Sequence, residues 1–419
     1  MTSAKATPLY FLFACLFFVV GCLPTARSQP SARLTTAADT SQAAPAAQTT
    51  SLPLPPPPTP TTTPASILAY LRQGNLWFWE ATTQREVQVT GAGNIHAFAW
   101  SPDGALLATY TGRDVCFLAA ADGRTLACTP LPGAPTTQYK ASSVIWSPQQ
   151  DQLLIIQDTW WLVQVAQGQP TEITHFEDPQ TWGAVWPGIE DPLSPAYTGQ
   201  ALFLNDGSLL GSAAHAYACG SGGCTHQLFR FNRETVRLEP FGGPALSSGG
   251  DQLHLSADGR LLINYGTFHV GCGMYTTRVT ITDLTTGNGR SFAFEQEAFD
   301  ELVFAPDGQQ LLVAQGEGCG SLGQAVWSVS CGLSDAFAIY PLQLWDWQAN
   351  SRETLLPGLE PEWSPDGRHI AFRSCLAQSP AGIWEPIHSG PPWLYILSFQ
   401  TDGYVIVPVA IGQSPAWQP

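Results

Sequence analysis

The chain has 419 residues, with 17 lysines and arginines against 33 aspartates and glutamates, and a formal net charge of −16. Three of the basic and one of the acidic residues precede residue 66. The remainder therefore carries 14 positive and 32 negative side chains, and Lys140 is its only lysine. A phosphate-binding surface needs clustered cations, so this composition argues against nucleic acid and anionic lipid headgroups as partners.

Residues 1–21 have the pattern of an export signal. Lys5 stands in a short n-region, and Leu9 to Val20 form an apolar h-region. A run of about a dozen apolar residues is too short to span a bilayer core, which needs roughly 20. The sequence "VVGC" at Val19 to Cys22 resembles the bacterial lipobox, which implies cleavage before Cys22 and a lipid on its thiol. An ordinary cleaved signal with an incidental cysteine is the alternative.

Residues 22–65 follow as a stretch rich in Pro, Thr, Ala, Ser and Gln that ends in "SLPLPPPPTPTTTPA" and has almost no charge. Such a composition buries little apolar surface and favours extended polyproline conformations. We therefore expect a disordered tether that begins at the lipidated cysteine and leads to a folded domain over residues 66–419.

A phrase with an aromatic or apolar anchor recurs along this domain. The anchors are Trp100, Trp146, Phe203, Leu255, Phe304, Trp363 and Trp417, spaced 46, 57, 52, 49, 59 and 54 residues apart. Within the first period, "HAFAWS" alternates as a strand, "PDG" forms a turn, "ALLATYT" returns, "DVCFLAA" runs out again, and "TLACTPL" finishes after "ADGR". Four antiparallel strands per period of about 50 residues are typical of a propeller blade.

The turn of this phrase has a physical basis. Pro presets φ, Asp bonds to nearby backbone, and Gly accepts the positive φ of a tight hairpin. Three copies, "FAWSPDGALLA", "FAPDGQQLLVA" and "EWSPDGRHIAF", resemble the TolB-type, WD40-like (PD40) propeller repeat. That resemblance covers nearly all of residues 66–419 and implies an all-β propeller. The copy at Trp146 departs from it because "SPQQDQ" lacks the glycine.

The two ends of the domain complement each other. The stretch "SILAYLRQGNLWFWEATTQREVQVT" supplies the second, third and fourth strands of a blade without a first, and the C-terminal "SPAWQP" supplies that first strand. One sheet shared by both ends closes the ring and removes its open edges. The sequence thus predicts seven blades, with the irregular stretch from His175 to Gly199 as the place where a blade is most easily miscounted.

Long connections are expected on one face of the ring, where the second strand of each blade leads to the third. Six of the eight cysteines beyond Cys22 fall in these connections, and an even number of cysteines in an exported chain favours disulfides. Cys116 and Cys128 flank a tight turn, and Cys219 and Cys224 are placed to close a small loop. The pairing among the remaining four stays open: Cys272, Cys319, Cys331 and Cys375.

Aromatic and histidine side chains in the long connections are the candidates for a binding surface, because rigid amphipathic rings give contact area at low entropic cost. The candidates are Trp182, Trp186, His215, His269, Trp327, Trp384 and His388. Packing of the connections themselves is the alternative for each tryptophan. Trp160, Trp161, Trp345 and Trp347 lie in strand-like runs and are expected in the core.

The sequence contains no pattern for a metal, a cofactor or a nucleophile. No CxxC, HExxH or GxSxG motif occurs. Acidic residues of the long connections are candidates for a catalytic pair, which a glycosidase needs at a defined separation. They are Glu177, Asp178, Glu190, Asp191, Glu317, Asp335 and Glu385.

The expected function is non-catalytic recognition by a monomeric lipoprotein on the extracytoplasmic face of a membrane. An envelope protein or peptide is the expected partner, as the fold resemblance implies. Carbohydrate or cell-wall glycan binding is one alternative and predicts exposed coplanar tryptophans on the loop-rich face. A propeller-borne glycoside hydrolase or lyase is the other and predicts paired carboxylates near the ring axis.

Overall fold

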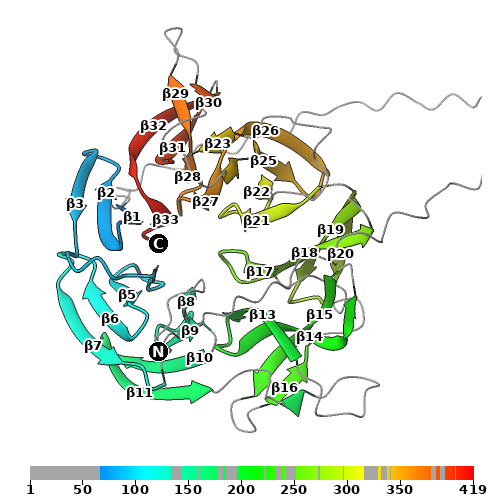
Figure 1. The fold of residues 1–419 in the computed structure, drawn as a ribbon, viewed down its shortest axis with the longest axis horizontal. Coiled ribbons are helices and arrows are strands. Elements are labelled where there is room, and N and C mark those ends of the chain that lie inside the picture. The colour runs from blue at the N-terminus through cyan, green and yellow to red at the C-terminus, as the bar shows by residue number, and fades with distance from the viewer. Residues whose placement is uncertain are drawn as a thin grey trace, which may run out of the picture. The chain divides into compact units, whose positions relative to one another are not determined.

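Seven sheets are arranged in a ring, each built on four antiparallel strands, and one of them has a short fifth strand at its outer edge (Figure 1). The computed structural model describes residues 67–419 with the exception of 134–142, 158–159, 177–182, 185–195, 221–222, 233–236, 242–251, 272–273, 296, 316–328, 332–336, 340, 379–383, 387–391 and 402. In the part of the chain that the structure describes, no helix is long and apolar enough to cross a bilayer.

The first three blades, each from its innermost strand outward, contain short and regular strands. Blade 1 consists of β33 (Gln413–Trp417), β1 (Ile67–Arg72), β2 (Asn75–Glu80) and β3 (Arg85–Gln88). Blade 2 consists of β4 (Ala97–Trp100), β5 (Leu106–Tyr110), β6 (Asp114–Ala119) and β7 (Thr125–Pro130). Blade 3 consists of β8 (Ser143–Trp146), β9 (Gln152–Ile156), β10 (Trp160–Ala166) and β11 (Gln169–Phe176).

Blades 4 and 5 contain longer middle strands. Blade 4 consists of β13 (Ala196–Phe203), β14 (Leu209–Gly220), β15 (Gly223–Asn232) and β16 (Arg237–Pro240), with the short β12 (Gly183–Ala184) beside β16. Blade 5 consists of β17 (Gln252–Leu255), β18 (Leu261–Gly271), β19 (Met274–Asp283) and β20 (Gly289–Glu295).

Blades 6 and 7 each carry an extra hairpin between their second and third strands. Blade 6 consists of β21 (Phe299–Phe304), β22 (Gln310–Gln315), β25 (Pro341–Asp346) and β26 (Ser351–Pro357), with the hairpin β23 (Val329–Cys331) and β24 (Phe337–Ile339). Blade 7 consists of β27 (Leu359–Trp363), β28 (His369–Ser374), β31 (Trp393–Gln400) and β32 (Gly403–Ile411), with the hairpin β29 (Leu376–Gln378) and β30 (Trp384–Pro386).

The predicted closure of the ring is confirmed. β33 pairs antiparallel with β1, so that Trp417 lies opposite Leu68 and Ala416 opposite Ala69. The backbone N–H of Gln418 also donates to the carbonyl of Ile67 at 2.8 Å. The predicted number of seven blades is confirmed as well, and each predicted anchor ends the innermost strand of one blade.

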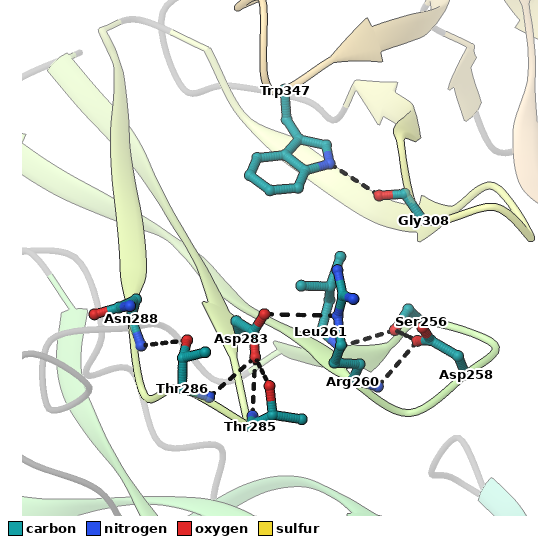
Figure 2. A network of polar contacts seen from close by, with 10 residues as sticks. All are labelled: Ser256, Asp258, Arg260, Leu261, Asp283, Thr285, Thr286, Asn288, Gly308 and Trp347. Carbon is teal, nitrogen blue, oxygen red and sulfur yellow. Dashed lines mark hydrogen bonds and ion pairs between the residues drawn. The ribbon is translucent and has the colours of Figure 1, made fainter.

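The turn after each innermost strand is held by a buried serine in four of the blades. Ser256 is 4% exposed, and its hydroxyl donates to Asp258 Oδ1 at 2.6 Å while accepting from the backbone N–H of Leu261 at 2.9 Å. Figure 2 shows this turn and its link to the outer turn of the same blade, where Arg260 lies 3.5 Å from Asp283. The turns between the first and second and between the third and fourth strands thus share one face, which we call the turn face.

The equivalent serines are Ser101, Ser147 and Ser364. In blade 3 the position of the missing glycine is taken by Gln150, which adopts a φ of 63°. The turn is therefore retained without its glycine, at the conformational cost of a left-handed non-glycine residue. Its aspartate, Asp151, comes one position after Gln150 and still accepts from Ser147 at 2.8 Å.

Anchor tryptophans join neighbouring blades. Trp146 Nε1 donates to the carbonyl of Ala99 in blade 2 at 3.2 Å, and Trp100 Nε1 donates to Ala416 in blade 1 at 3.0 Å. Trp417 Nε1 donates to Glu362 in blade 7 at 3.3 Å. The acceptor is in each case the residue before the anchor of the preceding blade, so the same bond recurs at three junctions of the ring.

Trp363 departs from this pattern. Its side chain is 8% exposed and packs in the core between blades 6 and 7, yet its Nε1 has no hydrogen-bond partner among the described residues. The ring stacks on Phe399 of its own blade, with centroids 5.7 Å apart. The junction between blades 6 and 7 therefore lacks the hydrogen bond that Trp100, Trp146 and Trp417 make.

We predict that Trp146→Phe destabilises the domain more than Trp363→Phe, by about 1 kcal/mol. Both changes remove similar apolar area, but only the first breaks a hydrogen bond and leaves a carbonyl without its donor. Phenylalanine is already tolerated at the anchors Phe203 and Phe304. Urea unfolding of the two variants measures the difference, and equal losses would contradict the assignment of the bond.

Candidate functional site

The face opposite the turn face carries raised ribbons on blades 4 to 7 and short connections on blades 1 to 3. In blades 1 to 3, two or three residues join the second strand to the third. In blade 4 these strands lengthen to 12 and 10 residues, and in blade 5 to 11 and 10. Because all these connections join the same two strand positions, they project from one face, which we call the ribbon face.

The hairpins β23–β24 and β29–β30 complete this set on blades 6 and 7. In Figure 1, β29 and β30 (orange) extend away from the ring of sheets. Cys375, at the base of the second hairpin, is disulfide-bonded and 1% exposed. The disulfide adds a covalent constraint where the hairpin begins.

Three of the predicted binding residues lie on these ribbons. The backbone of His215 lies on β14 opposite Ala196, and that of His269 lies on β18 opposite Tyr275. Trp384 lies on β30 opposite Gln378. Trp182, Trp186, Trp327 and His388 are outside the described residues, so the proposed aromatic surface stays a prediction.

Trp393 is a ribbon-face residue that the sequence analysis missed. It begins β31, directly after the β29–β30 hairpin, and its side chain is 39% exposed. Tyr404, at the far end of blade 7's outermost strand, is 42% exposed. These are the large aromatic side chains that are exposed in the described part of the chain, and nearly the full length of β32 separates them, so they form no common platform.

Two predicted cysteine pairs are adjacent in the structure. Cys116 and Cys128 lie opposite each other on β6 and β7 and form a disulfide. Cys219 and Cys224 lie opposite each other near the tip of the β14–β15 ribbon. The backbone of Cys331 lies on β23, while Cys272 and Cys319 are outside the described residues.

The four tryptophans expected in the core are buried. Trp161 and Trp345 are fully buried, Trp160 is 3% exposed, and Trp347 is 9% exposed and donates to the carbonyl of Gly308 at 3.1 Å (Figure 2). No group of three metal-ligating side chains occurs among the described residues.

The side chains of the innermost strands alternate between greater and lesser burial. Anchors and the residues two before them are mostly buried, while the residues one and three before them mostly keep partial exposure. One residue before the anchors the side chains are Ala99, Ile145, Leu202, His254, Val303, Glu362 and Ala416. Ionisable side chains at this position thus occur in blades 5 and 7 alone.

Two carboxylates of the innermost strands, Glu301 on β21 and Glu362 on β27, form what we call the axial pair. Burial, followed by the charges of Glu362, Glu360 and Asp300, raises the pKa of Glu301 to about 8. Burial raises the pKa of Glu362 to about 7. Both side chains keep some exposure but are largely surrounded by protein, which disfavours the charged carboxylate.

Groups on the same and neighbouring strands add to this environment. Burial lowers the pKa of His254, on β17, to about 4. The Arg373 guanidinium on β28 pairs with Glu360, whose Oε2 also accepts from the backbone N–H of Ser414 at 2.7 Å. Glu360 is therefore charge-compensated, whereas no ion pair forms with either member of the axial pair among the described residues.

The axial pair was not among the acidic residues that the sequence analysis selected. Glu177, Asp178, Glu190, Asp191, Glu317 and Asp335 are outside the described residues, and Glu385 lies on β30. The repeat itself contained an indication that Glu362 is unusual. Comparing the residue before each anchor sets Glu362 apart from the alanines and aliphatic residues of most other copies.

Solved structures similar to this fold include TolB from Acinetobacter baumannii, at 16% identity over 85% of this chain and 67% of that chain, with a TM-score of 0.42. They also include a putative 6-phosphogluconolactonase from Bacteroides fragilis, at 12% identity over 86% and 99%, with a TM-score of 0.47. The dihydro-heme d1 dehydrogenase NirN matches at 12% identity over 86% and 77%, with a TM-score of 0.48. Identities of this size concern the fold alone.

No family model matches the sequence, and no curated protein matches it. At these identities and TM-scores, the three structural neighbours indicate no activity for this chain. A propeller fold of this kind fits a binding module, because rigid blades support variable connections.

We predict that the stability of the domain falls as the pH rises from about 4.5 to 8. Carboxyls with raised pKa values bind protons more tightly in the folded state than in the unfolded chain, so their ionisation opposes folding. At about 1.4 kcal/mol per pKa unit, the effect is several kcal/mol at most, and partial exposure reduces it. His254 acts in the opposite sense, because its lowered pKa costs stability as the pH falls below about 6.5.

Urea unfolding at a series of pH values tests this prediction in the wild type and in the variant Glu301→Gln/Glu362→Gln. Between pH 5.5 and 8.5, the free energy of unfolding of the double variant should fall much less than that of the wild type. Glu353→Gln, which replaces an exposed carboxylate on β26, is the matched control and should show the same fall as the wild type. An equal decline in all three proteins would contradict the assignment.

Proposed function

We propose that this chain is an exported, lipid-anchored lipoprotein whose propeller is a non-catalytic binding module, and that its ribbon face contacts an envelope protein or peptide. The observation that carries the proposal is the restriction of raised ribbons to one face of blades 4 to 7. Blades 1 to 3 demonstrate that the same sheet closes with two or three residues, so ring formation does not require the ribbons.

The chemistry of the ribbon face supports recognition of a polypeptide. Trp393 supplies an exposed indole next to a hairpin whose base is covalently held at Cys375. Indoles on a rigid support are the side chains that contribute most to protein interfaces. Disulfides also suit a compartment outside the cytoplasm, which agrees with the proposed export signal.

We predict that Trp384→Ala/Trp393→Ala lowers partner capture about tenfold, which corresponds to about 1.4 kcal/mol. The full chain is cross-linked in intact cells of the source organism, and captured proteins are quantified by mass spectrometry. Val87→Ala is the matched control, because Val87 is 43% exposed on β3 of blade 1, away from the ribbons.

Capture that is insensitive to the ribbon variant would contradict the proposed interface. If the folded chain captures no protein, binding of cell-wall glycan becomes the reading to test, with a glycan array as the assay.

The proposed anchor makes a separate prediction. Cys22→Ser removes the thiol that would carry the lipid, so the chain should move from the membrane fraction to the soluble fraction. Cell fractionation followed by immunoblotting measures this, and Cys15→Ser is the control that should leave the distribution unchanged. Retention of the Cys22→Ser variant in membranes would contradict lipid anchoring.

A glycoside hydrolase or lyase is the second candidate, and the axial pair is the observation that favours it. Such enzymes use one carboxyl with a raised pKa as the acid and a second as base or nucleophile. Both Glu301 and Glu362 have raised pKa values. Hydrolysis of an envelope polysaccharide that is lost in Glu362→Gln would replace the binding module as the proposed function.

A further inference from the structure

The outermost strand of blade 7, β32, differs in composition from the outermost strands of the other blades. Its nine residues, "GYVIVPVAI", include no charged side chain. Five of the other outermost strands each contain at least one: β3, β11, β16, β20 and β26. β7 of blade 2 is also uncharged, but it has six residues and no large apolar side chain that is exposed.

Exposed apolar side chains are concentrated on this strand and its neighbour. Among the described residues, five large apolar side chains are exposed. Tyr404, Val405 and Ile411 lie on β32, and Trp393 lies opposite Ile411 on β31. The fifth, Val87, lies on β3 of blade 1. Four of the five thus belong to one hairpin, and such a concentration indicates an interaction surface.

β32 also has a free hydrogen-bonding edge at the rim of the ring (Figure 1, red). One edge pairs with β31, and no strand in the described part of the chain pairs with the other. Natural proteins protect such edges with charges, proline or bulges. Pro408, which has no N–H to donate, and the register shift beyond it interrupt the second half of the strand. The first half, residues 403–407, is regular and carries none of these protections.

The charge of the protein indicates which strand adds to this edge. Residues 66–419 carry 32 acidic and 14 basic side chains, so most contacts between two copies would bring like charges together. At β32, two copies can meet without a charged residue on either strand. A strand with charges would have to desolvate them against Tyr404 and Val405, which is unfavourable. The β32 strand of a second copy meets this requirement and is the occupant that the composition favours.

We propose that two copies of this chain associate through β32, with residues 403–407 of the two copies paired antiparallel about a two-fold axis at Val405. In this register Val405 lies opposite Val405 of the second copy, and Tyr404 lies opposite Ile406 of the second copy. Pairs of aromatic and β-branched residues are among those that stabilise antiparallel sheets. The two blades thereby form one continuous sheet, and the contact is the same on both copies, as two-fold symmetry requires.

This pairing leaves the ribbon face accessible. Residues 403–407 follow the turn after Gln400, at the turn-face end of β32, whereas Ile411 and Trp393 lie at the ribbon end. Self-association therefore goes beyond the proposed binding function and does not depend on it. It replaces the monomer that the sequence analysis expects with a dimer that presents two ribbon faces, which increases the avidity for a partner with repeated binding sites.

A disulfide across the two-fold axis tests the proposal with the full chain in intact cells. Val405→Cys should link two copies, because residues directly opposite on antiparallel strands have Cβ atoms roughly 4.5–5.5 Å apart, close to disulfide geometry. Non-reducing electrophoresis and immunoblotting should show a band at twice the mass of the chain. Val87→Cys, at a similarly exposed position on β3, is the matched control and should give no such band.

Sedimentation equilibrium of the full chain in detergent gives a second, independent measurement. The wild type and Val87→Lys should both be dimers. Val405→Lys places two ammonium groups opposite each other, so it should raise the dissociation constant of the dimer at least about tenfold. A monomeric wild type would overturn the proposal, as would an unchanged dissociation constant in Val405→Lys. A Val405→Cys chain that stays unlinked, or that links only to a different protein, would also overturn it.

Discussion

The pairing of β33 with β1 is the constraint on which the rest of the structure depends. A propeller blade buries its faces only against two neighbours, so an open array would expose two apolar faces and two strand edges. Because the first strand of blade 1 comes from the other end of the chain, separation of that blade requires breaking a backbone ladder as well as a core. The bond from Trp100 to Ala416 and that from Gln418 to Gly104 add blade 2 to the same closure.

Because the ring is closed, the junctions between blades need not contribute equally to its stability. The ring resists opening at any one place because the other junctions hold the blades in position. This permits the junction between blades 6 and 7 to carry an unpartnered indole, and β21 and β27 to carry carboxylates with raised pKa values, although both features cost stability. Local instability within a stable ring is where conformational responses usually arise.

The repeat made the architecture predictable from the sequence, because anchors and turns recur at a nearly constant spacing. Each copy leads to the same assignment of strands and turns. Ring closure followed from an incomplete phrase at each end. The serine of the turn was not assigned a role in advance, since a buried hydroxyl and an exposed one look alike in a sequence. Ser147 retains its bond to Asp151 even though the turn is rearranged around Gln150.

The axial pair was harder to predict because its position depends on strand register. β27 changes register between Leu359 and Glu362, and Glu360 adopts a φ of 50° there. Such bulges change which face of the sheet each side chain takes, and they leave no clear mark in a sequence. The missing partner of Trp363 has the same origin, because it depends on how two separate sheets meet.

The two halves of the ring are built differently. In blades 1 to 3 the residues one and three before the anchors are alanine, isoleucine and serine, and short turns connect the second and third strands. In blades 4 to 7 the same positions include Gln200, His254, Glu301 and Glu362, and every second-to-third connection is extended. The long ribbons are not needed to build a blade, because the first half of the ring forms its blades without them. Their concentration in consecutive blades therefore argues that one half of the ring acts mainly as a scaffold and the other carries the function.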